Sequence, residues 1–337
     1  MNVVNEDILQ IVRNTNLNFL RGKSVLITGA SGLMGSYFAQ VFMHLGLTGN
    51  GPVKLFLTSK SGKFQFDTGN FTEIIEGNLA NGALLSGLPN VDIIIHAAGY
   101  GQPGKFLENE YLTLELNTTV TLSLINKVKQ GGKFLFLSSS EVYSGLGEPP
   151  FLETQIGTTN TDHQRSAYIE AKRTGEAITH VAHKLRKIDA KSVRLSLAYG
   201  PGTKIDDSRV LNTFIRQAIL NKRIEMFDTG QSMRTYCYLT DAIEMCLEAL
   251  GKGNEPIYNV GGVSRIRIRE LARLICESTG SELVSPPNDN HALTGAPNDV
   301  WLNISKITDL NGKKNFVAMQ EGVKRTINWQ KNSLYQV

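Results

Sequence analysis

The sequence predicts an α/β fold in which a doubly wound parallel sheet is joined to a smaller C-terminal α/β domain. From Lys23 onward, short apolar runs alternate with helix-length segments, which is the pattern of a parallel sheet covered by helices on both faces. A glycine-rich turn directly follows the first of these runs. The chain of 337 residues is long enough for one large or two modest domains.

The elements follow one another in a regular order. Residues 1–21 are predicted to form a helical extension, with the apolar residues of one helix face buried: Ile8, Ile11, Val12 and Leu17. Strands are predicted to begin near residues 24, 53, 73, 91, 133 and 191. Helices are predicted over residues 35–45, 110–129 and 166–186.

The rhythm of the sequence changes after Gly200, where strand-like pieces become short and occur near residues 223, 234 and 256. We therefore expect a first domain at residues 22–197, to which residues 233–262 return. The second, smaller domain would consist of residues 198–232 and 263–337.

Composition excludes several classes of protein. Hydrophobic residues make up 41% of the chain and charged residues 20%, so the chain is not disordered as a whole. The net charge is +4 and the basic residues are dispersed, which argues against nucleic acid or an anionic membrane as a partner. No apolar run approaches the ~18 residues of a membrane span, and the N-terminus lacks the pattern of a signal peptide. We expect a cytoplasmic protein.

The residues that often bind metal are scattered. Cys237, Cys246 and Cys276 form no CxxC pair, which argues against a disulfide framework and a thiolate site. His180 and His183 share a predicted helix but have no acidic or third histidine partner nearby. We expect no metal site.

The glycine-rich turn is the first motif that carries chemistry, and it lies between a predicted strand and a predicted helix. Its GxxGxxG spacing permits a tight turn, close approach of the backbone to a pyrophosphate, and close packing of helix on strand. The helix N-terminus then favours the negative phosphates. The sequence thus predicts that residues 22–197 are an NAD(P)-binding Rossmann-type domain. The predicted cofactor contacts in the turn are Gly29, Ser31, Gly32, Leu33, Met34 and Gly35.

The end of the second strand bears on which dinucleotide binds. An acidic residue usually stands there and holds the adenosine ribose hydroxyls, but this chain has Thr58, Ser59 and Lys60. Because Lys60 and Lys63 could bind a 2′-phosphate, the sequence favours neither NAD nor NADP as the cofactor. The alternative is that both lysines are solvated loop charges.

A phenol and an ammonium four residues apart form the predicted catalytic pair. Tyr168 and Lys172 lie on one face of a predicted helix. An ammonium near a phenol lowers the pKa of the phenol, so Tyr168 could act as a general base on an alcohol. Ser139, Ser140 and Glu141 follow an apolar strand at the edge where ligands bind in such sheets. The alternative for Glu141 is a helix cap or a solvated turn carboxylate.

At this point the motifs resemble, in order, those of the extended short-chain dehydrogenase/reductases that modify nucleotide sugars. The matching stretches cover nearly the whole chain from Lys23: residues 29–35, 92–98, 117–118, 138–143, 168–172 and 199–201. The resemblance implies a nucleotide-sugar substrate, a bound NAD(P), a C-terminal substrate domain and a homodimer formed through paired helices. It adds the following cofactor contacts to those above: Asn78, Leu79, Ala97, Ala98, Gly99, Asn117, Tyr168 and Lys172.

Within this family the chain most resembles UDP-glucuronate decarboxylases, on residues 139–143, 207–210, 230–234 and Asp241. The resemblance implies oxidation at C4 with Tyr168 as base, loss of carbon dioxide, and reduction on one bound cofactor. Ser140, Glu141 and Arg234 would position the carboxylate, although Arg234 could equally hold the diphosphate. The predicted substrate contacts are Pro103, Lys105, Glu141, Arg209 and Arg234.

Two departures from the family pattern stand out. Leu197 occupies the place of an Asn that touches the substrate, and Asn78 that of an Asp that reads the adenine. A 4,6-dehydratase or a 4-epimerase stays open as an alternative, although glucose-type dehydratases carry Asp where this chain has Ser140. A non-catalytic NAD(P)-binding sensor is the alternative of another class.

Overall fold

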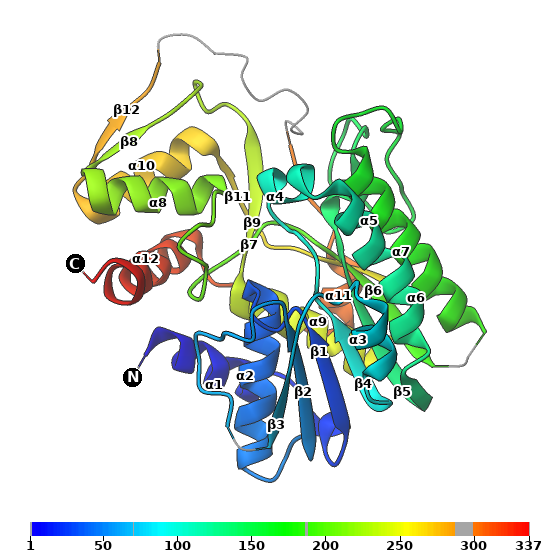
Figure 1. Cartoon of the computed structure of the whole chain (residues 1–337). Coiled ribbons are helices and arrows are strands. Elements are labelled where there is room, and N and C mark those ends of the chain that lie inside the picture. The colour runs from blue at the N-terminus through cyan, green and yellow to red at the C-terminus, as the bar shows by residue number, and fades with distance from the viewer. Residues whose placement is uncertain (1, 70, 186–187, 287–298, 337) are drawn as a thin grey trace.

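The computed structural model describes residues 2–69, 71–185, 188–286 and 299–336. Within these residues a seven-stranded sheet forms the centre of the molecule, in the order β10-β6-β5-β4-β1-β2-β3 (Figure 1). Every pair of neighbouring strands is parallel, so the predicted fold class is confirmed. The strands are β1 (Ser24–Thr28), β2 (Lys54–Ser59), β3 (Thr72–Glu76), β4 (Val91–His96), β5 (Val128–Ser139), β6 (Asp189–Leu195) and β10 (Ile257–Val260).

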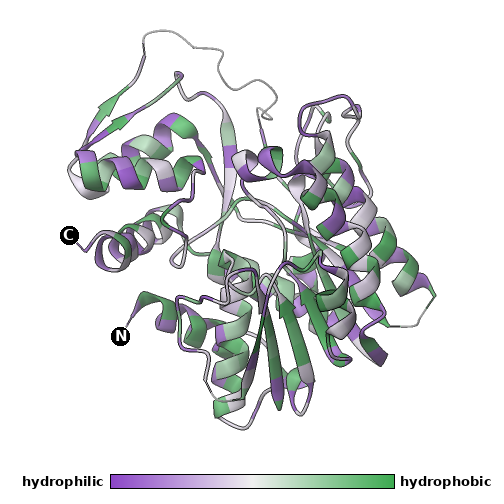
Figure 2. Cartoon of the chain, in the orientation of Figure 1, coloured by the Kyte–Doolittle hydropathy of each residue, from purple (hydrophilic) through white to green (hydrophobic). Residues whose placement is uncertain are grey.

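Helices cover both faces of this sheet because its strands carry apolar side chains on both faces. Figure 2 shows these strands largely in the green of hydrophobic residues. Val25 and Ile27 of β1 point to one face, which is covered by α1 (Val3–Asn14), α2 (Leu33–Leu47) and α9 (Leu239–Lys252). Leu26 points to the other face. The helices there are α3 (Gly82–Gly87), α5 (Glu110–Asn117), α6 (Thr119–Ile125) and α7 (Ser166–Lys184).

The prediction of a single helix over residues 110–129 is wrong, because the structure has two helices there, α5 and α6. Thr118 lies between them with φ −115° and ψ −83°, outside the helical region. Several β-branched residues follow one another at this point, and such side chains lose rotamer freedom in a helix. Val128 already begins β5.

The remaining elements form a second lobe with its own apolar core (Figure 1). Its helices are α8 (Val210–Asn221), α10 (Ile268–Thr279) and α12 (Met319–Gln330). Among the described residues, β11 (Ser264–Arg267), β9 (Met233–Tyr238) and β7 (Ala198–Tyr199) form a three-stranded sheet, and β8 (Arg223–Glu225) pairs with β12 (Glu282–Val284). After β9 the chain returns to the large sheet through α9 and β10. Helix α11 (Ser305–Asn311) packs beside α9.

The N-terminal extension is held by a buried carboxylate that the sequence analysis missed. Ile8 and Ile11 of α1 are buried as predicted, and so is Asp7. Its carboxylate accepts hydrogen bonds from the Tyr37 hydroxyl at 2.9 Å, the Tyr238 hydroxyl at 3.0 Å and Arg325 Nη2 at 2.7 Å. The extension is therefore fixed to α2, β9 and α12.

Candidate active site

The carboxyl ends of β1, β4 and β5 meet at one edge of the sheet because these strands are parallel. From β1 the chain passes outward to β2 and β3, and then returns to β4 on the other side of β1. Ligands in open α/β sheets bind outside the carboxyl edge at such a reversal. Several of the predicted site residues, among them Gly29, Gly99 and Glu141, lie in the segments that follow these strand ends.

The glycine-rich turn between β1 and α2 has the shape of a cradle for phosphate. Gly29 has a φ of +65°, and a Cβ at this position would lie 2.7 Å from the backbone of Ala97 and Ala98. A Cβ at Gly35 would lie 2.3 Å from the Gly29 carbonyl oxygen. Gly32 caps α2, and the first N–H groups of a helix have no partner within it. The residues present therefore fit the pyrophosphate of a dinucleotide.

The other predicted dinucleotide contacts flank this turn. Leu33 and Met34 open α2, so their N–H groups are among those without a partner inside the helix. Asn78 follows β3, and its Oδ1 accepts the backbone N–H of Ala80 at 3.2 Å. An amide oxygen has two lone pairs, so one acceptor site on Asn78 is left for an adenine amino group. Leu79 is buried in the core.

The end of β2 is tied to the glycine-rich turn. Thr58 and Ser59 are both buried. Ser59 Oγ lies 3.0 Å from Ser31 Oγ, to which it donates a hydrogen bond, whereas Lys60 is exposed. Two hydroxyl side chains thus stand where a carboxylate is usual.

His96 at the end of β4 is a structural residue. Its Nε2 lies 2.9 Å from the Leu116 carbonyl oxygen and its Nδ1 lies 2.7 Å from Thr28 Oγ1. A carbonyl only accepts, so Nε2 carries the proton and Nδ1 accepts from the hydroxyl. The same hydroxyl accepts the N–H of Ala98 at 3.2 Å. Burial lowers the pKa of His96 to about 4, so the neutral ring holds the backbone after β4 in place.

The structure brings Lys172, Asn117 and Gly99 together. Lys172 Nζ donates to Asn117 Oδ1 at 2.8 Å and to the Leu137 carbonyl oxygen at 2.7 Å. A Cβ at Gly99 would lie 3.8 Å from the same Nζ. Burial lowers the pKa of Lys172 to about 7, and the charge of Glu176 opposes this effect. An ammonium has three donors, so one is left for a further partner.

Tyr168 lies beside these groups and is buried. Its hydroxyl is hydrogen-bonded to Ser139, and burial raises the pKa of the phenol to about 12. The expectation that Lys172 lowers this pKa is wrong for the protein alone. The ammonium is drawn to Asn117 and Leu137, and its Nζ is 5.7 Å from the Tyr168 ring centroid. The phenol therefore keeps its proton at neutral pH.

Glu141 is neither a cap nor a solvated turn carboxylate. Ser139 caps the short 3-10 turn at Ser140–Tyr143 and accepts the Glu141 N–H at 3.2 Å. The Glu141 side chain is 16% exposed, and its Oε1 accepts a hydrogen bond from Arg165 Nη2 at 2.8 Å. Its Oε2 is buried without a hydrogen-bond partner among the described residues. Burial raises the pKa of Glu141, while Arg165, Arg234 and His163 lower it.

Sequence reasoning missed the role of Arg165. This residue is buried at the N-terminus of α7, and its guanidinium lies 5.4 Å from the centroid of the Phe106 ring. Phe106 in turn stacks on Tyr168, with centroids 4.3 Å apart and planes 10° apart. A signal was available, because Arg165 precedes Tyr168 by three residues, and residues at this spacing are neighbours on a helix.

The predicted substrate contacts surround this group less closely. The positive charge of Arg234, on β9, acts to lower the pKa of Glu141. Its Nη1 donates a hydrogen bond to the Met233 carbonyl oxygen at 2.7 Å. Arg209 is ion-paired with Asp207 at 2.6 Å, and Lys105 with Asp206 at 2.6 Å. Pro103 opens α4 (Pro103–Glu108), the helix that carries Phe106.

A buried ion pair lies behind the predicted catalytic residues. Glu176, one turn beyond Lys172, receives hydrogen bonds from Arg194 Nη2 at 2.8 Å and from Ser138 Oγ at 2.5 Å. Arg194 Nη1 also donates to the Tyr143 hydroxyl at 2.8 Å. This pair therefore fixes α7 to both ends of the segment that carries Ser139 and Glu141.

Leu197, at the position where the resemblance predicts an Asn, packs against the core of the second lobe. Among the described residues, no group of three or more His, Cys, Asp or Glu side chains is arranged to hold a metal ion. None of the helices in these ranges is long and apolar enough to cross a membrane.

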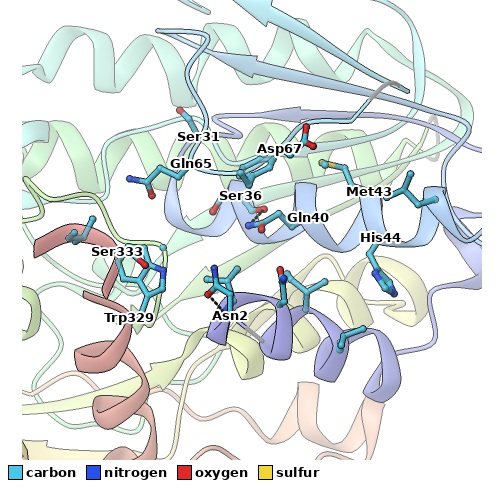
Figure 3. A pocket seen from close by; sticks show the side chains of 18 residues that line it. Asn2, Ser31, Ser36, Gln40, Met43, His44, Gln65, Asp67, Trp329 and Ser333 are labelled. Carbon is cyan, nitrogen blue, oxygen red and sulfur yellow. Dashed lines mark hydrogen bonds between the residues drawn. The ribbon is translucent and has the colours of Figure 1, made fainter. Parts of the chain in front are cut away.

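A cavity of about 640 Å³ lies away from the catalytic residues, between α1, α2 and the end of α12 (Figure 3). Ile8, Met43 and Trp329 supply part of its apolar wall, and Asp67 lines it from the loop after β2. Ser31 is the one predicted cofactor residue among the described residues that line it. The cavity therefore borders the glycine-rich turn, and none of the predicted catalytic residues lines it.

Comparisons with known proteins agree with this geometry. A family model described as "NAD dependent epimerase/dehydratase family" matches residues 25–261. The UDP-glucuronic acid decarboxylase 2 of Arabidopsis thaliana is 28% identical over 307 residues, which cover 90% of this chain and 67% of the relative. The chain thus spans about two thirds of the length of this relative.

Solved structures share the fold. A dTDP-glucose 4,6-dehydratase from Streptomyces venezuelae, crystallised with NAD, matches with a TM-score of 0.79, 19% identity, and coverage of 93% of this chain and 98% of that one. A UDP-glucuronic acid 4-epimerase from Bacillus cereus, in complex with UDP-glucuronic acid and NAD, matches with a TM-score of 0.75, 21% identity, and coverage of 92% and 99%. At these identities the likeness shows the fold.

Proposed function

We propose that this chain, which belongs to the NAD-dependent epimerase/dehydratase family, decarboxylates a nucleotide-linked uronate such as UDP-glucuronate through a transient 4-keto sugar. The observation that carries the proposal is the charge around Glu141. Arg165 and Arg234 both act on this one carboxylate, and His163 adds to their effect. Arginine side chains bind carboxylates with two parallel hydrogen bonds, so this pair of arginines suits a substrate that brings a carboxylate of its own. A neutral hexose has no such group.

The oxidation at C4 would use the buried half of the site. Tyr168, hydrogen-bonded to Ser139, would accept the proton of the C4 hydroxyl as a phenolate, a form that the positive charge of bound oxidised NAD would favour by lowering the pKa of the phenol. NAD, when bound, supplies the acceptor that takes the C4 hydride and later returns it. Lys172, Asn117 and the glycine-rich turn are the groups that would hold the dinucleotide.

Decarboxylation would use the charged half of the site. The new ketone at C4 is β to the carboxylate, so the electron pair of the C5–C6 bond passes into an enolate as carbon dioxide leaves. C5 then needs a proton. Glu141 would donate it from its protonated form, which burial favours by raising the pKa, and its buried Oε2 has no other partner among the described residues. Arg165 and Arg234 would orient the departing carboxylate.

The named relatives support this substrate class, since the decarboxylase from Arabidopsis thaliana matches over most of the chain. The solved structures of similar fold include an epimerase and a dehydratase. All three reactions can begin with oxidation at C4, so the middle step distinguishes them.

The test is the mass of the product. Purified protein with NAD is incubated separately with UDP-glucuronate, UDP-glucose and dTDP-glucose. We expect UDP-glucuronate to lose carbon dioxide and the hexoses to stay unchanged. Loss of water from a hexose would instead assign a dehydratase, and a new stereoisomer of unchanged mass an epimerase. No reaction with any sugar would favour a sensor.

We also propose a homodimer. Large apolar side chains are exposed on the outer helices of the large domain, which lie side by side in Figure 1. They are Tyr111, Leu114, Leu122, Val181 and Leu185. Light scattering of the purified protein should give twice the chain mass of 37.1 kDa. Val181→Glu, at an exposed position, should then give the monomer.

A further inference from the structure

The end of β2 lacks the carboxylate that usually holds the adenosine ribose in this kind of fold. Thr58 and Ser59 end the strand, and Ser59 is bound to Ser31 of the glycine-rich turn. If no carboxylate lay beside the end of β2, no negative charge there would repel the 2′-phosphate of NADP, and the exposed Lys60 would attract it.

The neighbouring strand β3 does place a carboxylate beside the end of β2. Glu76 ends β3, and the parallel register places it opposite Ser59. The backbone N–H of Gly77 donates to the Ser59 carbonyl oxygen at 3.0 Å, so the two strand ends are joined here. Residues opposite each other on neighbouring strands project to the same face of a sheet. Glu76 therefore points to the same side as Ser59, which faces the glycine-rich turn.

The Glu76 side chain leans over the turn that follows β2. A Cβ at Gly62 would lie 2.6 Å from Glu76 Oε2, and the φ of +62° at this glycine shows how tightly the turn bends beside the carboxylate. Glu76 is exposed. Within the described ranges it has no ion pair, and in particular none with Lys60 or Lys63. Its oxygens are thus available to an incoming hydroxyl.

We propose that Glu76 supplies from β3 the ribose-binding carboxylate that β2 lacks, and so selects NAD over NADP. Its oxygens would accept hydrogen bonds from the 2′- and 3′-hydroxyls of the adenosine ribose, and its negative charge would repel a 2′-phosphate. The inference concerns dinucleotide binding alone and does not depend on which sugar the enzyme uses.

A second carboxylate near the turn provides a discriminating control. Asp67 lies in the loop after β2 and lines the cavity in Figure 3. Its Oδ1 accepts the N–H of Gly69 at 3.1 Å, within its own turn. Glu73 is a matched control on β3 itself, where it projects to the opposite face from Glu76 and pairs with Lys54 at 3.0 Å.

Calorimetric titration of the full chain with NAD and with NADP, without any sugar, tests the proposal. We expect the unmodified protein to bind NAD about tenfold or more tightly than NADP, which corresponds to about 1.4 kcal/mol. Glu76→Gln should remove most of that ratio, and Glu76→Lys should reverse it. Asp67→Asn and Glu73→Gln should leave the ratio unchanged.

Three results would overturn the assignment. One is a preference of the unmodified protein for NADP, and another is an unchanged ratio in Glu76→Gln. The third is a loss of the ratio in Asp67→Asn, which would place the ribose carboxylate in the loop. Because Glu76 is exposed, circular dichroism should show the same fold in every variant.

Discussion

Replacing Arg165 with Gln tests whether the site recognises the carboxylate of a uronate. The guanidinium lies 2.8 Å from Glu141, and the two side chains are only 9% and 16% exposed. The substitution removes one cation and its hydrogen bond and leaves Arg234 in place. A hydrogen bond to a charged group contributes ~1.5–3 kcal/mol, which corresponds to roughly a ten- to 150-fold change in an equilibrium constant.

The effect should fall mainly on KM. The carboxylate exists in the bound substrate but leaves as neutral carbon dioxide, so a cation that binds it stabilises the ground state at least as much as the transition state. We therefore expect Arg165→Gln to raise KM for UDP-glucuronate by roughly ten- to 150-fold and to lower kcat by a smaller factor. Binding of UDP-glucose, which has no carboxylate, should hardly change.

Initial rates of decarboxylation and calorimetric binding of UDP-glucose provide the two measurements. Arg165→Lys should restore part of the loss, because it keeps the charge without the planar fork. Arg223→Gln is the control, since Arg223 forms a surface pair with Glu225 at 3.1 Å and should change neither measurement. If UDP-glucose binding falls as far as UDP-glucuronate binding, or if KM for UDP-glucuronate is unchanged, Arg165 does not recognise the carboxylate.

Three further predictions concern the catalytic base and the buried charges. Tyr168→Phe should abolish product formation while NAD still binds in a calorimetric titration; residual turnover above about one per cent of normal would argue against the phenol as base. The pKa of His96 is about 4 in the folded chain, against 6.5 for a histidine outside the fold. Between pH 6.5 and pH 4 the unfolded chain therefore binds more protons than the folded one, so the free energy of unfolding should fall by about 3 kcal/mol as the pH is lowered across this range. His96→Gln should flatten this part of the stability profile in urea unfolding, and His180→Gln at an exposed position should not. Arg325→Met should destabilise the fold by about 3 kcal/mol at pH 7 by leaving buried Asp7 without its cation; because burial already raises the pKa of Asp7, this loss should shrink as the pH falls and the carboxyl takes up its proton.

Local spacing explains which features the sequence could predict. The glycine-rich turn is a run of seven residues whose neighbours predict a strand and a helix, and its geometry needs only those residues. Tyr168 and Lys172 are four apart on α7, so helix geometry alone places them on one face. The strand positions followed from apolar runs in the same way.

Features that depend on contacts between distant segments were not predictable. Glu141 and Arg165 meet because β5 and α7 pack side by side, across 24 positions of sequence. Asp7 meets residues that are 30, 231 and 318 positions away. The carboxylate beside the end of β2 comes from β3, and only the register of the two strands reveals it. The spacing of residues along the sequence does not predict such contacts.

Burial also changes the pKa values that the sequence predicts for Tyr168 and Lys172. Considered as a pair, the ammonium should lower the pKa of the phenol. In the fold, burial outweighs this effect and shifts His96, Lys172 and Tyr168 to about 4, about 7 and about 12, each toward the neutral form. At neutral pH His96 and Tyr168 are therefore uncharged in the protein alone, and Lys172 is about half protonated. Glu141 and Arg165 form an ion pair beside Tyr168, which suits a substrate whose hydroxyl is oxidised at Tyr168 while its carboxylate is lost beside that pair.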